Sequence, residues 1–183
     1  MTIDEQIKKI DELKKYIKNE LPILAQKVLV SDLIALVTNR VTQEGLDFKG
    51  SPFKPYSTTA IGAGLFSGKS RTQTAEKKIK LMSKSGLSLS YSQFRKLNNL
   101  NTDKKIFEFT GEMWTKFGIV DLSKSDNSIS VKVGGRNQAS QDKIDFNSSR
   151  EGISIIENSV TEELIVQQTA QDWLNRQTKR ILS

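Results

Sequence analysis

The apolar residues of the first forty-four positions follow helical spacing. Ile3, Ile10, Ile17 and Leu24 recur every seven residues, which predicts an amphipathic helix over residues 3–20. Its apolar stripe packs either on the protein's own core or between copies of the chain. Pro22 has no backbone N–H, so we expect it to kink this helix or to begin a second one.

The most regular pattern in the chain lies between Pro22 and Glu44. Its apolar members, at spacings of three and four, are Val30, Leu33, Ile34, Val37 and Val41. This spacing predicts a helix with one buried face, and Gly45 supplies its C-cap.

Residues 57–105 lack such a pattern. They contain few large hydrophobic side chains and many Ser, Thr, Lys and Asn residues. Within them, 72–83 has helix-forming composition and 91–97 predicts a short helical turn. A stretch of this length inside a compact domain is usually functional or mobile. We expect an excursion that is partly helical and is ordered mainly by partners.

Short strands are predicted next. Residues 106–109 form one strand before Gly111, and the alternation in 128–133 pairs with 116–122 as a β-hairpin. Gly134 and Gly135 are expected to end this hairpin, which spans 116–133. Residues 136–150 are polar and are predicted to be a loop.

The last helix begins with a capping box made by Ser159 and Glu162. Its apolar members are Leu164, Val166, Ala170, Trp173 and Leu174, and we expect them to pack across the sheet. The pattern as a whole predicts an α+β fold in a single domain, 1–183. It comprises a helical region (1–44), an extended basic excursion (45–105), and the hairpin plus the C-terminal helix (106–183).

Composition removes several classes of function. The chain has no histidine and no cysteine, which excludes serine–histidine triads, thiolate metal sites and disulfides. The longest unbroken apolar run, 33–37, is too short for a membrane span. The first residues lack the pattern of a signal peptide. We therefore expect a protein made in the cytoplasm, without a membrane partner.

The net charge of +7 comes from the middle of the chain. Residues 45–105 hold twelve Lys/Arg against three Asp/Glu, a balance of +9. The candidate interaction residues are Lys69, Arg71, Lys77, Lys78, Lys80, Lys84, Arg95 and Lys96, followed by Lys104 and Lys105. Three interpretations remain open: contact with a nucleic-acid backbone, docking on an acidic protein surface, or a solvated face.

Two patterns suggest chemistry but lack its geometry. Gly68-Lys69-Ser70 ends like a phosphate-binding P-loop, yet Ala63 stands where the first glycine is required, so a flexible loop is predicted. The carboxylate pairs are Glu108 with Glu112, Asp142 with Asp145, and Glu162 with Glu163. Nothing around them is typical of a metal site. We predict no catalytic, cofactor-binding or metal-binding residues, and so no enzyme. A magnesium-dependent nuclease or ATPase is the third hypothesis.

Aromatic residues next to prolines predict an ordered connector. Phe53, Pro55 and Tyr56 are expected to anchor the start of the excursion against the sheet near Gly111, because proline fixes the backbone angle beside each ring. Trp114 and Trp173 are expected in the core.

Three short blocks resemble the tail-completion (virion-morphogenesis) proteins of Mu-like tailed phages. The first contains Arg40, Gly45, Gly50, Phe53, Pro55 and Tyr56; the second is Phe109-Thr110-Gly111-Glu112-Met113; the third is Arg150-Glu151-Gly152-Ile153-Ser154. They come in the family's order, and the excursion is long and basic compared with the family.

The resemblance implies a structural virion protein that joins the phage head, at its portal, to the tail. It would be a neck or tail-completion subunit in a ring of about six or twelve copies. Its partners would be the portal and the adjacent neck or tail proteins, with DNA in the lumen as a further partner. The alternative function is a stand-alone nucleic-acid-binding protein that uses residues 69–105 without sequence preference.

Overall fold

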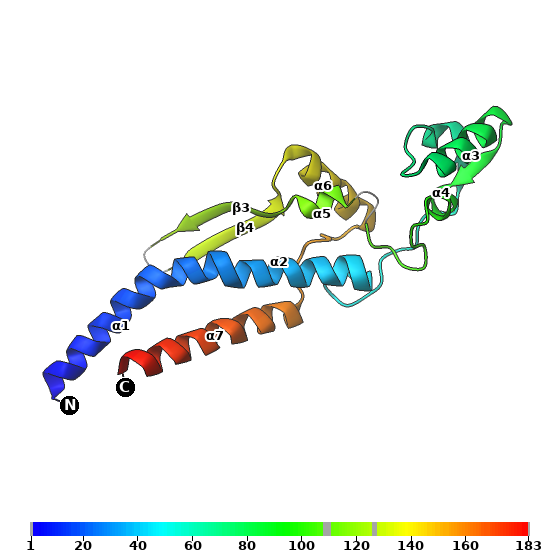
Figure 1. Ribbon diagram of the computed structural model, residues 1–183. Helices are drawn as coiled ribbons and strands as arrows, with labels where there is room; N and C mark the ends of the chain where they lie inside the picture. The colour runs from blue at the N-terminus through cyan, green and yellow to red at the C-terminus, as the bar shows by residue number, and fades with distance from the viewer. Residues whose placement is uncertain (1, 108–110, 126–127, 183) are drawn as a thin grey trace.

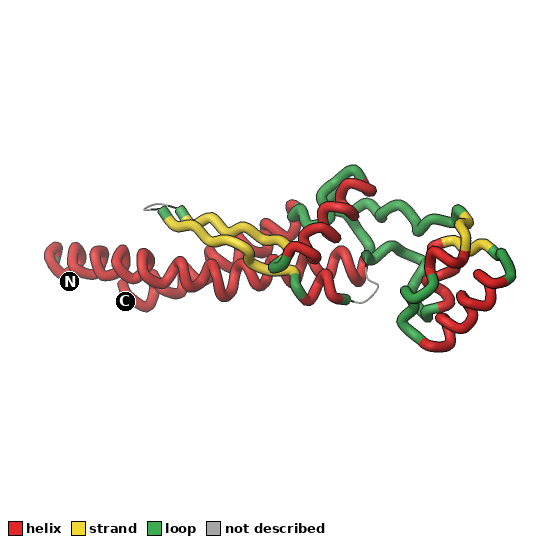
Figure 2. Tube along the Cα trace, turned by 90° about the horizontal axis from the view of Figure 1, so that it is seen from above, coloured by secondary structure: helices red, strands yellow, loops and turns green. Residues whose placement is uncertain are grey.

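The computed structural model describes residues 2–107, 111–125 and 128–182 and shows an elongated α+β molecule (Figure 1). Two parts are distinct in the view. A body contains the long helices and a β-hairpin, and a small lobe, residues 57–100, projects from one end of it. We call this part the basic lobe. The view from above shows the same separation along the long axis (Figure 2).

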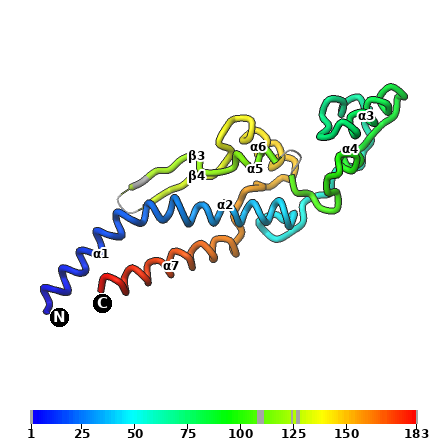
Figure 3. Tube along the Cα trace, in the orientation of Figure 1, coloured from blue at the N-terminus to red at the C-terminus, as the bar shows by residue number. Residues whose placement is uncertain are grey.

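One continuous helix runs through the body. It consists of α1 (Ile3–Leu24), a π-helical turn η1 (Ala25–Leu29), α2 (Val30–Asn39) and a second π-helical turn η2 (Arg40–Glu44). Pro22 lies inside α1, so the helix does not begin again there. The trace bends between α1 and α2 (Figure 3), and η1 is a local widening of the type that commonly accompanies helix kinks. Gly45, with φ 72°, ends the helix as predicted.

By length and composition, the helix from Ile3 to Glu44 is also apolar enough to cross a membrane. The helix contains no long unbroken apolar run, because polar residues such as Lys27 and Asp32 interrupt it. Core helices of soluble proteins meet the same criterion when they are mostly buried, whereas 17% of the apolar stretch is buried here, where α2 contacts other elements of the body.

The last helix, α7 (Val160–Leu182), runs antiparallel along α1 and α2. It does not pack across the sheet, as we had expected. In Figure 1 the long helix separates α7 from the hairpin, and α7 packs along α1, η1 and α2 instead. Trp173 is half-buried there and stacks on Tyr16, with 6.2 Å between ring centroids.

The predicted hairpin is present. β3 (Phe117–Lys124) pairs antiparallel with β4 (Ile129–Gly135), with Ile119 opposite Val133 and an irregularity before Asp121. Gly134 and Gly135 lie inside β4 rather than after it.

A glycine is required at position 135 because the next helix passes very close. A Cβ on Gly135 would lie 2.3 Å from the backbone nitrogen of Gln141.

The strand predicted at 106–109 is wrong for its described part, since neither Ile106 nor Phe107 is in a strand and Phe107 has φ 48°. The rest of that strand lies outside the described residues.

Residues 136–150 are not a loop. α6 (Gln138–Glu151) follows the short α5 (Glu112–Thr115) and β4, and Asn137 caps it by accepting a 2.9 Å hydrogen bond from the Ser140 amide. Its exposed polar side chains bond to each other one turn apart, as in Gln138 to Asp142 at 2.7 Å. Only a narrow face around Ile144 is buried, which is why hydrophobic periodicity does not reveal this helix.

The body has one hydrophobic core, to which the long helix, the connector, α5, the hairpin, α6 and the segment before α7 all contribute. Its buried members are Val37, Val41, Phe53, Met113, Phe117, Ile144 and Ile155. Trp114 packs against this core and meets Phe117 edge to face at 5.5 Å.

The basic lobe has a separate core, which contradicts our expectation that partners order it. It contains β1 (Ala60–Gly62), η3 (Ala63–Phe66), α3 (Gln73–Lys84), β2 (Ser88–Ser90) and α4 (Tyr91–Leu97). β1 pairs antiparallel with β2, and the two predicted helical segments are confirmed as α3 and α4. The buried residues of its hydrophobic core are Ala63, Phe66, Ile79, Leu89 and Phe94.

Stacked aromatic rings compensate for the small number of apolar residues in this lobe. Phe66 and Phe94 lie 4.7 Å apart and nearly parallel, and such ring pairs add to the stabilisation from buried area. The segment predicted as a flexible loop, 61–70, is therefore anchored at Ala63 and Phe66.

Because the two cores are separate, a cavity in one should leave the other folded. Ile79→Ala, at a fully buried position, is expected to destabilise the lobe by about 2–5 kcal/mol. Amide hydrogen exchange should show lost protection in α3 and α4 with little change in α7. The matched variant Ile144→Ala should show the reverse, and equal loss everywhere in both variants would contradict two separate cores.

Candidate functional site

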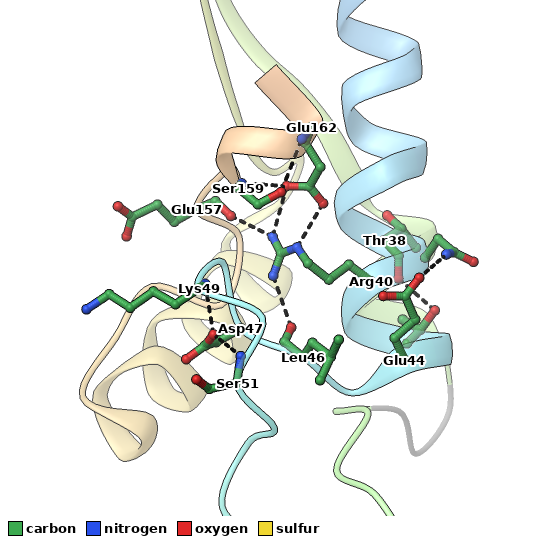
Figure 4. A network of polar contacts seen from close by, with 12 residues as sticks. Thr38, Arg40, Glu44, Leu46, Asp47, Lys49, Ser51, Glu157, Ser159 and Glu162 are labelled. Atoms are coloured by element: carbon green, nitrogen blue, oxygen red, sulfur yellow. Dashed lines mark hydrogen bonds and ion pairs between the residues drawn. The ribbon is translucent and has the colours of Figure 1, made fainter. Parts of the chain in front are cut away.

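Arg40 is the buried centre of a polar network at the end of the long helix (Figure 4). Its Nε donates to Glu162 at 2.8 Å, its Nη1 to the Leu46 carbonyl at 3.0 Å, and its Nη2 to the Glu157 carbonyl at 2.6 Å. The Arg40 and Glu162 side chains are only 8% and 6% exposed. We call this set of contacts the Arg40 clasp.

Local sequence explains how each part of the clasp is positioned. Gly45 turns the chain back after the helix, and the Asp47 carboxylate then accepts 2.8 Å hydrogen bonds from the amides of Lys49 and Ser51. This short turn presents the Leu46 carbonyl to Arg40. On the other side, the capping box is confirmed, because Glu162 accepts a hydrogen bond from the Ser159 amide and its own amide bonds to the Ser159 hydroxyl. The same carboxylate thus caps α7 and pairs with Arg40.

The residues of the three sequence blocks meet in the body. Phe53 from the first block and Met113 from the second are buried in the body core, and Ile153 from the third packs against it. Phe109 and Thr110 of the second block lie outside the described residues. Gly152, with φ 76°, ends α6 and directs the chain toward the clasp.

Phe53 and Tyr56 of the connector are buried as predicted, but they contact different parts of the molecule. Phe53 belongs to the body core and meets Phe107 edge to face at 4.7 Å. The Tyr56 hydroxyl accepts a 3.2 Å hydrogen bond from the Ile106 amide, and the Arg95 guanidinium lies 4.1 Å over its ring. Tyr56 therefore joins the lobe to the body, whereas Pro55 is exposed and acts through its backbone alone.

A second buried ion pair lies beside this junction. Lys105 pairs with Glu151, and both side chains are less than 5% exposed. Glu151 also accepts a 3.1 Å hydrogen bond from the Lys54 amide. Lys105 is thus a structural cation and is not available to a partner. It had been predicted among the candidate interaction residues.

A cavity of about 420 Å³ opens where the lobe meets the body. Aromatic and cationic side chains line it, among them Tyr56, Tyr91, Arg95, Phe107, Trp114 and Arg150. Gly111 also lines it, but the contacts of Tyr56 are with Tyr91, Arg95 and the Ile106 amide and not with the sheet, against which we had expected it to pack. Lys143, another lining residue, is paired with Glu112 at 2.7 Å, and that lysine lowers the pKa of the Glu112 carboxyl.

Seven of the eight predicted interaction residues are exposed and one is not. The exposed residues are Lys69, Arg71, Lys77, Lys78, Lys80, Lys84 and Lys96. Arg95 is 1% exposed, holds the Asn101 carbonyl at 3.0 Å and covers Tyr56. Its role is to pack the lobe against the connector, so it cannot meet a partner as predicted.

The P-loop-like segment is occupied by a carboxylate of the chain itself. The Gly68 amide donates to Glu76 at 2.7 Å, and the Ser67 hydroxyl lies 3.3 Å from the same oxygen. The Gly68 amide is the main reason why the pKa of the Glu76 carboxyl is lowered. The amide that a phosphate would need is therefore already used.

The carboxylate pairs do not form metal sites in the part of the chain that the structure describes. Asp142 and Asp145 lie on α6, not in a loop, and each accepts a hydrogen bond from a glutamine one turn earlier. Glu162 belongs to the clasp, and Glu108 lies outside the described residues. No group of three or more possible ligands occurs among the described residues.

Comparison with known proteins gives no relative. No family model matches the chain, no curated protein matches it, and no solved structure matches it.

The Arg40 clasp should be costly to break. Arg40→Met leaves the Glu162 carboxylate buried without its partner and removes a donor from two carbonyls, so the free energy of unfolding should fall by about 3–5 kcal/mol. Lys143→Met is the matched control, because its ion pair with Glu112 is about half exposed; it should lower the free energy of unfolding far less than Arg40→Met does. Urea unfolding measures both values, and equal small losses would contradict the role of the clasp.

Tyr56 should contribute to stability through both its ring and its hydroxyl. Tyr56→Phe leaves the Ile106 amide without its acceptor, at a cost of about 1–3 kcal/mol, and Tyr56→Ala should cost about 3–5 kcal/mol. Urea unfolding at neutral pH measures the free energy of unfolding of both variants. An unchanged free energy of unfolding in Tyr56→Ala would contradict the packing role and favour an interface role for the ring.

The pH dependence of the same variants provides a second measurement. Burial raises the pKa of the Tyr56 phenol above its ordinary value. The unfolded chain therefore loses this proton first, at about pH 10. The stabilisation is present below that pH and is lost as the pH rises further, so the difference between wild type and Tyr56→Phe should narrow in alkaline solution.

Proposed function

We propose that this chain is a structural subunit of a phage virion that joins the head, at its portal, to the tail as part of a neck or tail-completion ring. The proposal begins with the resemblance of three short sequence blocks to tail-completion proteins of Mu-like phages. Its partners would be further copies of the chain, the portal and the adjacent neck or tail proteins.

The observation that carries this proposal is the meeting of the three blocks in one place. Phe53, Met113 and Ile153 come from segments about forty to sixty residues apart and pack on one core. Arg40 then ties the first block to the segment that follows the third. Blocks that mark a common fold are expected to converge in this way; apolar residues of any compact domain also meet in its core, so the buried polar contacts of Arg40 are the more specific part of the observation.

Exposed apolar side chains give independent support for self-assembly. Ile3, Ile7 and Ile10 form a stripe at the free end of α1 and are 75%, 54% and 45% exposed. Val160 and Leu164, at the start of α7, are 73% and 58% exposed. Exposed apolar side chains that lie together on one face, as these three isoleucines do, often mark contact surfaces.

The positions of these two surfaces suit a ring. They lie toward opposite ends of the body, because α7 starts near the end of α2 and α1 extends away from it (Figure 1). A contact between two different surfaces of neighbouring copies is heterologous, and it closes into a ring when the rotation between copies allows. The body would form the wall of that ring, with the Arg40 clasp fixing the two helices that carry the surfaces.

Sedimentation velocity on the purified chain tests this function. We expect a discrete assembly of about six or twelve copies, formed alone or on addition of the portal protein. Replacing Ile3, Ile7 and Ile10 with serine should abolish it without lowering the melting temperature, because these side chains are exposed in the monomer.

A matched change on the lobe is the control. Ile61→Ser with Leu87→Ser alters side chains that are also about half exposed and should leave the assembly intact. A chain that stays monomeric at all concentrations and does not bind the portal would show that the proposal is wrong.

A further inference from the structure

The basic lobe carries a charge that its own fold does not use. Residues 57–100 contain eight Lys/Arg and one acidic residue, Glu76. Arg95 is buried in the packing of the lobe, and the other seven cations are exposed. The net charge of residues 57–100, eight cations less one carboxylate, is therefore +7, which equals the net charge of the whole chain.

One helix face concentrates these cations. Lys77, Lys80 and Lys84 recur at spacings of three and four on α3, opposite the side that buries Ala75 and Ile79. At about 1.5 Å per residue, this row is about 10 Å long. That length corresponds to about three phosphate steps along one strand of a duplex.

Glu76 does little to neutralise this face. Its carboxylate is held by the Gly68 amide and the Ser67 hydroxyl, and its side chain is 19% exposed. Lys80 lies 3.7 Å from it with a side chain that is 61% exposed, and such exposed pairs are weak. The face opposite the lobe core is therefore positive along its length.

The kind of cation favours nucleic acid over an acidic protein. Six of the seven exposed cations are lysines, and Arg71 is the seventh. Protein interfaces are depleted in lysine and enriched in arginine. Phosphate contacts without sequence preference need only mobile point charges, which lysine supplies.

We propose that the α3 face of the basic lobe, centred on Lys77, Lys80 and Lys84, binds the phosphate backbone of duplex nucleic acid without reading its sequence. This interaction goes beyond the joining role and does not depend on ring formation. In a virion, the duplex would be the genome where it passes through the ring between head and tail.

Fluorescence anisotropy with a labelled duplex tests the proposal on the full chain over a series of salt concentrations. The variant Lys77→Gln/Lys80→Gln/Lys84→Gln should bind at least about tenfold more weakly near physiological salt. Each lost phosphate contact should also reduce the slope of log K against log salt by about 0.9, so the triple variant should lose about 2.7.

A control with the same change in net charge makes the result specific. Lys8→Gln/Lys15→Gln/Lys18→Gln alters three exposed lysines of α1 and should retain most of the affinity and the slope. Circular dichroism should show that both variants are folded. Equal losses in the two variants would show that net charge alone acts, and would overturn the proposed face.

The competing partner is tested directly with polyglutamate. We expect it to displace the duplex only at a large excess of charge. Binding of polyglutamate with no binding of the duplex would overturn the proposal in favour of an acidic protein partner. The sedimentation result is independent of these assays, so failure of one proposal leaves the other measurable.

Discussion

The buried ion pair between Arg40 and Glu162 constrains the whole body. Neither charge can remain buried alone without a large free-energy cost, so the end of the long helix and the start of α7 must arrive together. The guanidinium also requires the Leu46 and Glu157 carbonyls, which places the turn after Gly45 and the segment before Ser159. This arrangement fixes where α7 begins, and the contacts of α7 with α1 and α2, such as Trp173 stacked on Tyr16, set its direction along the long helix.

The junction between the body and the basic lobe depends on polar and aromatic contacts rather than on a shared core. Tyr56 bridges them through Arg95 and the Ile106 amide, and the pair of Lys105 with Glu151 fixes the returning chain. Such contacts are directional, so they orient the lobe where apolar packing alone would allow it to slide. The proposed roles of the molecule divide in the same way, with assembly on the body and charge on the lobe.

Local pattern was sufficient for the elements whose apolar face or cap is distinct. The helix before Gly45, the hairpin and the capping box at Ser159 were predictable because each has a periodic or fixed-distance signal. The helix α6 was missed because Ile144 is the only apolar member of its buried face, beside Ser140 and Glu151. The side of α7 was also wrong, because an amphipathic pattern states that a face is buried but not against which neighbour.

The same limit applies to the candidate site. The sequence indicates that Phe53 and Tyr56 are packed, because prolines fix the backbone beside them. It cannot show that Arg95 and Lys105 are buried while the lysines of α3 are exposed, because the partner of Lys105, Glu151, is 46 residues away. The distribution of charge along the sequence therefore indicates which segment is basic, but not which of its cations are exposed on α3.

The chain enters and leaves the basic lobe at nearly the same point of the body. Phe53 touches Phe107, Tyr56 bonds to the Ile106 amide, and a Cβ on Gly45 would lie 3.2 Å from the Lys104 side chain. The lobe is thus an insertion, with a small core of its own, between two adjacent positions of the body. Because its ends are already close together, it can be gained, lost or exchanged during evolution without rearranging the host, and a short linker could take its place.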